Sequence, residues 1–305
     1  EYTVQVDPDV GASLTLTNSA LVSLYYSFDN DAVPANGVDT EREEYGPTAA
    51  ATSSLTTPGP GALSKVESAS AVAVGDQFTY QILVPAMPVD TALFDVRITD
   101  DLGASAAVLS FVSVDRAPAA PGINSGAWTP TNTGTATQLV IEDTAGGIDI
   151  PAGEQIAVDI TVEVVDDPAN VDGLVFNNSA DYTFNRVDDD TATQGAGQPG
   201  TSGDTIIVEP GLVMTKTGPA TMSVGTSDLF TLDVQNTGSG AAWDITLTDH
   251  LPNLASGGMC DNAPVITAAR VFDTDGSTLL ADLAAGTDYV TRFAPSSPGT
   301  PCTFT

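Results

Sequence analysis

Cations are scarce in this sequence. Its 305 residues include only 8 Lys and Arg against 40 Asp and Glu, which gives a formal net charge of −32. A nucleic-acid-binding protein needs a basic face to neutralise phosphates, and so few cations cannot supply one. An anionic membrane surface would repel the chain for the same reason. A disordered acidic tail is also excluded, because 42% of the residues are hydrophobic and only 16% are charged. We therefore expect a folded protein with an acidic surface.

Cysteine, histidine and long apolar runs are nearly absent as well. Cys260 and Cys302 leave room for one disulfide bond, which we expect to form in an extracellular setting, and with a single His they cannot build a zinc site. The longest apolar run, residues 21–28, is interrupted by serines and is far shorter than the roughly 20 residues that span a bilayer. We expect no transmembrane segment. The chain opens at Glu1 without a leader, so we expect a mature product or an excised piece.

The dominant pattern is the alternation of apolar and polar residues. Several runs rich in Val, Ile, Thr and aromatic residues have a period of two, which is typical of strands. Clusters of Gly, Pro, Asn and Asp separate these runs, and no long stretch has apolar residues at helical spacing. The sequence therefore predicts an all-β sandwich fold. The clearest predicted strands are residues 77–84, 93–100, 155–164 and 229–234.

An internal repeat organises the chain. Residues 63–102 match residues 214–251 in the order and spacing of their motifs, and residues 3–20 echo residues 161–180. We therefore predict three parts. Residues 1–57 are the back part of a sandwich module, residues 58–209 are a complete module, and residues 210–305 are the front part of a third.

Two stretches resemble known families of bacterial surface proteins. The sequence DVQNTGSGAAWDITLTDHLP, residues 233–252, resembles the surface-protein repeat called domain of unknown function eleven. The sequence VGDQFTYQILVPAMPVDTALFDVRITDDL, residues 74–102, is similar to fimbrial isopeptide-forming domains, which are relatives of the collagen-adhesin fold. The resemblance covers most of residues 60–305. It implies tandem immunoglobulin-like β-sandwich modules in a secreted stalk, adhesin, pilus or sheath protein.

The resemblance implies a chemical role for the lysines. Lys65 and Lys216 are the only lysines, and they lie 151 residues apart, at the same phase of the repeat. In isopeptide-forming domains a first-strand Lys attacks the carboxamide of a late-strand Asn inside the core, and a buried carboxyl group assists. The resemblance therefore implies Lys65 as nucleophile, Asn178 as acceptor and Asp100 as the acid. Burial favours both the neutral amine and the protonated acid that this reaction needs.

Other interpretations of these residues stay open. Members of the surface-repeat family often carry this Lys without a crosslink, and a Thr-Asp pair often only caps a strand turn. The sequence also offers rival acids at Glu142, Asp159 and Glu163.

The repeat is offset from the two ends of the sequence. Residues 212–251 supply the front strands of the third module, while the Asn-Ser-Ala strand that would complete it recurs at residues 16–20. Either the sequence is a window cut from a longer array, or residues 1–57 of one copy complete the third module of the next copy, head to tail. In the second case Lys216 could meet Asn18 across the joint, with Asp249 as the assisting acid.

Acidic turns are candidate sites for calcium, because hard cations take oxygen ligands from clustered carboxylates. Solvated turns on an acidic surface are the alternative interpretation, since Asp is an ordinary turn former. The candidate ligands are Asp29, Asp31, Asp188, Asp190, Asp273 and Asp275.

These observations favour a structural role outside the cell. The sequence has no Gly-rich phosphate loop between a strand and a helix, so we expect no enzyme. We predict an extracellular or cell-surface protein, a stalk or filament subunit, whose partners are copies of itself or other surface proteins. The alternative is an adhesin that recognises a glycan or a protein.

Overall fold

The computed structural model describes residues 1–7, 9–27, 43–117, 128–144 and 146–305. In this part every regular element is a strand, except for the 3-10 turns η2 (Leu102–Ala104) and η3 (Thr191–Thr193). Contacts divide the chain into two compact units, Glu1–Ala241 and Ala242–Thr305. Among the described residues, no helix combines the length and apolarity that crossing a bilayer demands. The all-β prediction is confirmed.

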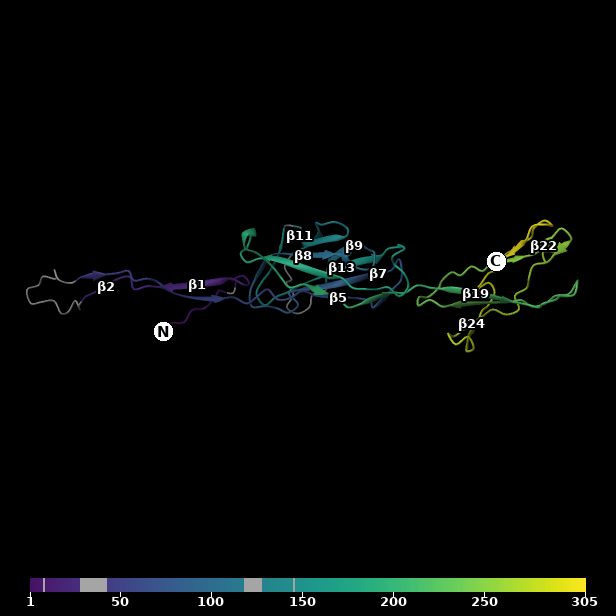
Figure 1. Cartoon of the computed structure of the whole chain (residues 1–305), viewed down its shortest axis with the longest axis horizontal. Helices are drawn as coiled ribbons and strands as arrows, with labels where there is room; N and C mark the ends of the chain where they lie inside the picture. Colours follow the sequence, from purple (N-terminus) through teal and green to yellow (C-terminus); the bar gives the residue numbers. More distant parts are fainter. Residues whose placement is uncertain (8, 28–42, 118–127, 145) are drawn as a thin grey trace, which may run out of the picture. The chain divides into compact units, whose positions relative to one another are not determined.

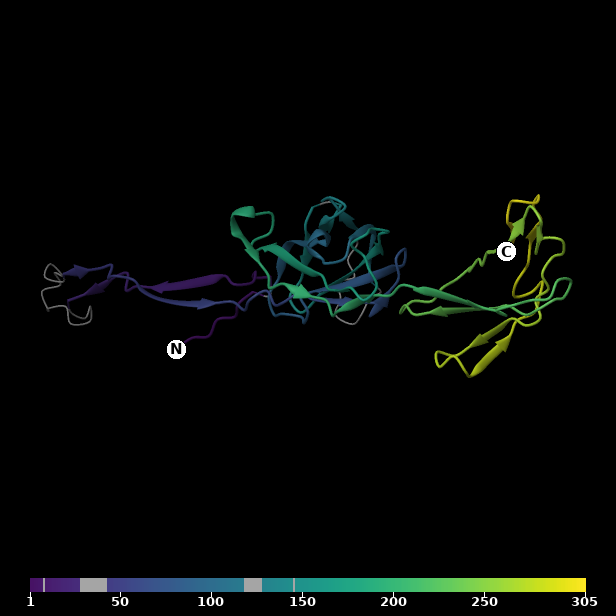
Figure 2. The same ribbon diagram turned by 45° about the vertical axis from the view of Figure 1, so that its right-hand side comes forward.

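The centre of the first unit is a sandwich of two antiparallel sheets, seen from two sides in Figures 1 and 2. One sheet has the order β5 (Ser64–Glu67), β7 (Gln77–Val84), β13 (Ile156–Val164), β9 (Leu109–Arg116). The other sheet has the order β10 (Pro130–Asn132), β11 (Gln138–Asp143), β8 (Leu93–Asp101), β15 (Ser179–Asn185), β16 (Gln194–Ala196). Two short strands extend this sheet: β12 (Ile148–Ile150) pairs with β8, and β17 (Gly200–Thr201) pairs with β15. This architecture confirms the predicted immunoglobulin-like sandwich.

The alternation in the sequence determines which side chains enter the core. Along β7, β13 and β15 every second residue is buried, as the period of two in a strand requires. In β8 the buried residues Leu93 and Val96 lie three positions apart, because Asp95 adopts a positive φ of 50° and introduces a bulge. The bulge shifts the alternation by one residue, so that Val96, Ile98 and Asp100 point into the core.

A smaller three-stranded sheet adjoins the sandwich. It consists of β14 (Val175–Phe176), β18 (Thr205–Ile207) and β6 (Ala71–Val72), and β18 pairs with β6 in parallel. Phe176, Ile207 and Val72 join the same hydrophobic core as the two large sheets. Residues 63–207 therefore supply nearly all of one continuous core.

Residues 15–27 pair with residues 43–56 as the two arms of a hairpin, and among the described residues no second sheet packs against these arms. It is built from β1 (Thr15–Ala20) with β4 (Ala51–Thr56), and from β2 (Tyr25–Tyr26) with β3 (Glu44–Tyr45). All of these residues are exposed except Leu16, which is half-buried. Figures 1 and 2 show this hairpin (purple) as a two-stranded ribbon. At its base Ala12 enters the sandwich core, and Thr57 donates a 2.8 Å hydrogen bond to the Gly11 carbonyl.

The front strands of the repeat recur at the end of the first unit. β19 (Leu212–Thr217) pairs with β20 (Thr231–Asn236), and Lys216 lies opposite Leu232. In the sandwich Lys65 likewise lies opposite an apolar residue of the paired strand, Ile82. β19 is exposed along its whole length.

The second unit is a set of short strand pairs. β21 (Asp249–Leu251) pairs with β27 (Cys302–Phe304), which also pairs with β26 (Phe293–Ala294). Two further pairs are β22 (Asn253–Leu254) with β23 (Gly257–Gly258), and β24 (Arg270–Phe272) with β25 (Leu279–Asp282). Among its described residues, buried apolar packing centres on Leu251 and the two cysteines.

Candidate functional site

Three polar residues from different strands meet inside the sandwich. Lys65 lies on β5 in one sheet, while Asp100 ends the inward-facing series of β8 in the other. Asn178 immediately precedes β15, the neighbour of β8. The exposed fractions of these residues are 4%, 1% and 2%. A lysine and an aspartate so deeply buried are unusual, because removing a charge from water is costly unless the charge is paired or neutralised.

Asp100 joins the other two residues. Lys65 Nζ lies 2.5 Å from Asp100 Oδ2, and both side chains are fully shielded from solvent. Asn178 Nδ2 donates to the other oxygen, Asp100 Oδ1, over 2.6 Å. The three residues predicted from the sequence are thus brought together in one chain of contacts, with the carboxyl group in the middle.

Burial shifts the protonation of the pair toward the uncharged forms. Loss of solvation lowers the pKa of Lys65, although the nearby Asp100 opposes this effect. Loss of solvation likewise raises the pKa of Asp100, against the opposing effect of Lys65. Moving one proton from the amine to the carboxylate gives a neutral, nucleophilic amine and a protonated acid.

The backbone holds Asn178 in place while its side-chain oxygen stays unsatisfied. The Asn178 backbone N–H donates to Ser202 Oγ over 3.1 Å, and the Asn178 carbonyl accepts from the Ser202 N–H over 2.9 Å. In the described part of the chain, Asn178 Oδ1 is buried without a hydrogen-bond partner. Rotating the carboxamide exchanges its N and O, so that a protonated Asp100 can donate to this oxygen. Such a bond would polarise the carbonyl.

Tyr80 is a member of the site that the sequence analysis missed. The Lys65 amine lies 4.3 Å from the centroid of the Tyr80 ring. Burial raises the pKa of Tyr80, so the phenol stays neutral. Strand alternation could have identified it, because Tyr80 shares the inward face of β7 with Ile82, the pairing partner of Lys65.

The rival acids lie elsewhere. Glu142 Oε2 is 2.5 Å from Arg97 Nε at the partly exposed side of the second sheet. Glu163 accepts from Gln77, and Asp159 accepts from Gln81, in exposed cross-strand pairs between β13 and β7. The geometry thus singles out Asp100 among the acids that the sequence left open.

The residues at the repeated positions, Lys216, Asn18 and Asp249, are distributed over both units. Lys216 lies on β19, with its amine 5.3 Å from the Phe230 ring centroid, as Lys65 lies over Tyr80. Asn18 is exposed on β1 and donates to Tyr2 Oη over 2.9 Å. Asp249 begins β21 in the second unit. A link among these residues stays a prediction.

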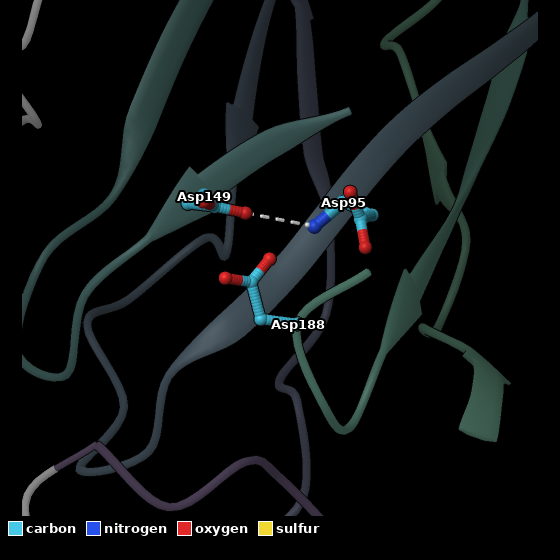
Figure 3. A group of neighbouring side chains, drawn as sticks. All are labelled: Asp95, Asp149 and Asp188. Carbon is cyan, nitrogen blue, oxygen red and sulfur yellow. Dashed lines mark hydrogen bonds between the residues drawn. The ribbon is translucent and has the colours of Figure 1, made fainter. Parts of the chain in front are cut away.

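One predicted calcium ligand lies in an acidic cluster. Asp188 meets Asp95 and Asp149, and their nearest carboxylate oxygens lie within 4.8 Å of one another (Figure 3). The Asp95 backbone N–H donates to Asp149 Oδ1 over 3.0 Å. Burial raises the pKa of Asp149, and the neighbouring carboxylates add to the shift. The bulge at Asp95 and the sequence-distant Asp149 could not be anticipated from turn motifs.

The other predicted ligands that the structure describes show no such gathering. Asp190 caps η3 by accepting from the Ala192 N–H. Asp275 accepts bonds from Thr278 and Ser277 in its own turn, which lowers its pKa, while Asp273 accepts from the Thr274 N–H. Asp29 and Asp31 lie outside the described residues. Calcium binding stays a prediction.

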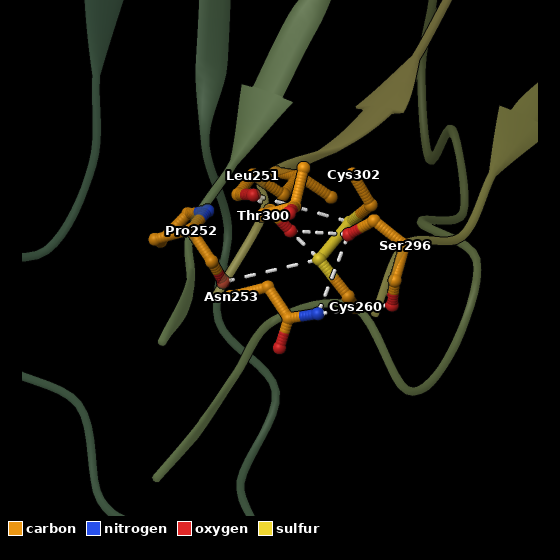
Figure 4. The surroundings of a disulfide bond; sticks show 7 residues. All are labelled: Leu251, Pro252, Asn253, Cys260, Ser296, Thr300 and Cys302. Carbon is orange, nitrogen blue, oxygen red and sulfur yellow. Dashed lines mark hydrogen bonds between the residues drawn. A yellow bond between two sulfur atoms is a disulfide. The ribbon is translucent and has the colours of Figure 1, made fainter. Parts of the chain in front are cut away.

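Cys260 and Cys302 form a disulfide bond in the second unit (Figure 4). Leu251, Phe293 and Phe304 pack against it. Beside it Asn253 Nδ2 donates to the Ser296 carbonyl over 3.1 Å. With so little apolar packing around it, this unit depends strongly on its covalent link.

Comparisons with known proteins give weak likenesses. No family model and no curated protein matches the sequence. Among solved structures, the full-length major pilin SpaD from Corynebacterium diphtheriae is similar, with 12% identity, a TM-score of 0.35, and coverage of 78% of this chain and 76% of that one.

Two further solved structures match a smaller part of the chain. The type I cohesin–dockerin complex from Clostridium thermocellum has a chain that matches with 10% identity, TM-score 0.32, and coverage of 48% and 95%. The collagen-binding subdomain ACE19 of the Enterococcus faecalis surface protein ACE matches with 15% identity, TM-score 0.27, and coverage of 46% and 94%. At such TM-scores the likeness assigns no function to this chain.

Proposed function

We propose that residues 58–209 form a self-crosslinked, load-bearing sandwich in an extracellular stalk or filament protein. The observation that carries this proposal is the buried contact of Lys65 and Asn178 with the two oxygens of Asp100. A buried Lys–Asp pair that served stability alone would be a poor choice, because apolar residues often stabilise a core as well or better. A pair poised to react explains why two ionisable side chains are retained in the core.

The proposed reaction is an intramolecular amide exchange. The neutral Lys65 Nζ attacks Asn178 Cγ while the protonated Asp100 donates a hydrogen bond to the carboxamide oxygen. The new Nζ–Cγ bond forms and the Cγ–Nδ2 bond breaks. Nδ2 leaves as ammonia after taking up the proton that the amine loses, so Asp100 ends in the state in which it began.

The position of the link suits a protein under tension. β5 is the first strand of one sheet, and Asn178 leads into β15 of the other sheet. A covalent bond between them would carry force across the core and bypass the intervening strands. Proteins exposed outside the cell keep their operational stability through slow unfolding, which such a bond enforces.

Peptide mapping tests the proposal. The full chain is denatured, reduced and digested, and the peptides that contain Lys65 and Asn178 are identified by tandem mass spectrometry. We expect one branched peptide lacking one ammonia, and no tryptic cleavage after Lys65.

Two variants of similar chemistry sharpen the experiment. Asp100→Asn keeps the size of the side chain and removes the acid, so the branched peptide should disappear. Glu163→Gln makes the same chemical change at an exposed rival acid and should leave the peptide unchanged. Separate linear peptides with a free Lys65 in the unmodified chain would overturn the proposal.

A further inference from the structure

The described arms of the N-terminal hairpin, residues 15–27 and 43–56, reproduce the register of the late hairpin of the sandwich. Ser19 lies opposite Thr52 as Ser179 lies opposite Thr201, and the pairing of Tyr25 with Tyr45 repeats that of Asn185 with Gln194. The hydrogen bond from the Thr48 N–H to the Val22 carbonyl repeats the one from Gly197 to Tyr182, and both measure 2.9 Å. The two hairpins therefore have the same register, although only one is packed into a sandwich.

The hairpin also presents a core-like face to solvent. The late strand of the sandwich buries Phe176, Ala180, Tyr182 and Phe184. The matching positions of the N-terminal hairpin are Leu16, Ala20, Val22 and Leu24. All four are apolar, yet Val22 and Leu24 are 51% and 45% exposed. An alternating apolar face left open in this way is a surface for docking rather than for solvent.

A complementary strand position exists in the second unit. Residues 243–249 repeat residues 94–100 of β8, and Asp244 has a φ of 49° where Asp95 has 50°. Ile245 and Leu247 take the places of Val96 and Ile98, which are fully buried, but they are 50% and 40% exposed. Residues 243–248 belong to no strand ladder among the residues that the structure describes.

In the sandwich Asp100 has a strand neighbour on each side, whereas Asp249 has one among the described residues. Asp249 pairs with Phe304 of β27 as Asp100 pairs with Leu139 of β11. In the sandwich the opposite edge of β8 is covered by β15, with Ala180 opposite Asp100. The second unit, considered by itself, thus gives β21 one strand neighbour, and the described part of the unit places no strand beside residues 243–248.

Charge favours a second copy of this chain as the occupant. Two molecules with a net charge of −32 repel each other wherever acidic surfaces meet. Residues 10–27 and 45–64, which include the stem of the hairpin, contain no charged residue at all. An exposed sheet edge is normally protected by charges, so a neutral one on so acidic a protein is suited to contact another copy.

We propose that the hairpin of one copy adds to residues 243–249 of another copy as an antiparallel strand. The register of the sandwich carries over, with Ala20 opposite Asp249, Val22 opposite Leu247 and Tyr25 opposite Trp243. Main-chain hydrogen bonds supply affinity, and the apolar face covers Ile245 and Leu247. Because the two surfaces differ, the contact is head-to-tail, and each added copy brings a further donor hairpin and a further acceptor segment.

Charge-insertion variants of the full chain test this interface by analytical ultracentrifugation over a range of concentrations. The unmodified chain should form a concentration-dependent ladder of oligomers. Val22→Asp with Leu24→Asp disables the donor face and should leave monomers. Thr17→Asp with Ser19→Asp adds the same charge to β1, on the opposite face of the same arm of the hairpin, and should retain oligomers.

A mixing experiment distinguishes this contact from any other. Ile245→Asp with Leu247→Asp disables the acceptor, so this variant should also be monomeric alone. Mixed with the donor-disabled variant, it still offers an intact hairpin to an intact acceptor, and the mixture should form dimers and nothing longer. Circular dichroism checks that each variant keeps its strands. A monomeric unmodified chain, oligomers that survive either disabling variant, or a mixture that stays monomeric would overturn the proposal.

Discussion

Removing the proposed crosslink without leaving a buried charge behind should lower the stability of the sandwich by a calculable amount. Asp100→Asn alone would leave Lys65 without its carboxylate, and breaking one half of a buried pair is itself strongly destabilising. The double variant Lys65→Met with Asp100→Asn avoids this cost. Met fills the space of the lysine stem, and the carboxamide oxygen introduced at position 100 can still accept from Asn178 Nδ2.

The expected loss follows from the length of chain that the crosslink closes. Positions 65 and 178 are 113 residues apart. The chain-entropy relation for crosslinks gives about 5 kcal/mol for a loop of this length. For a domain of this size, that loss corresponds to a melting temperature lower by roughly 10–20 °C.

Differential scanning calorimetry of the full chain measures this shift. The matched control is Lys216→Met with Asp249→Asn, which makes the same substitutions at the repeated positions and should leave the sandwich transition where it is. A double variant at positions 65 and 100 that melts within a few degrees of the unmodified chain would refute the reasoning, because no covalent restraint would then have been lost.

Further predictions concern pH, the disulfide bond and calcium. In a Lys65→Met variant, burial keeps the pKa of Asp100 raised, so the folded state binds the Asp100 proton more tightly than the unfolded state does. The contribution of Asp100 to the free energy of unfolding should therefore be greatest below about pH 4. Above that pH it should fall by roughly 1.4 kcal/mol per pH unit until the pKa of Asp100 in the folded state is reached. Denaturant titrations at several pH values measure this slope, and an equal slope in Lys65→Met with Asp100→Asn would contradict the assignment to Asp100. Replacing Cys260 and Cys302 by Ser removes a covalent link between positions 42 residues apart, which should destabilise the second unit by about 4 kcal/mol. Amide hydrogen exchange in β21 and β27 should then become faster. Unchanged exchange rates would exclude this contribution of the disulfide bond. Calcium should raise the melting temperature by relieving repulsion among Asp95, Asp149 and Asp188. The Asp149→Asn substitution should abolish this response. If excess chelator at matched ionic strength leaves the melting curve unchanged, the cluster is not a cation site.

Strand identity could be predicted from the sequence because it depends on local pattern, whereas the core site was implied by the family resemblance. Alternation identified β7, β8, β13 and β20, and the scarcity of lysine drew attention to Lys65. The family resemblance then supplied Asp100 and Asn178. The structure brings these three residues together, although their covalent linkage stays a prediction.

The features that could not be predicted arise from the bulge and from contacts between distant strands. Strict alternation from Leu93 would have placed Asp95 on the inward face of β8 and Val96 on the outer face. The positive φ of Asp95 reverses this phase and brings it beside Asp149 and Asp188. No turn motif in the sequence encodes that meeting.

The most direct test of the central claim is the intact mass of the unmodified 305-residue chain, denatured and with its disulfide reduced. A Lys65–Asn178 bond predicts a mass lower than that of the sequence by one ammonia, and the Asp100→Asn variant should lack this deficit. A chain that shows the full sequence mass would contradict the account.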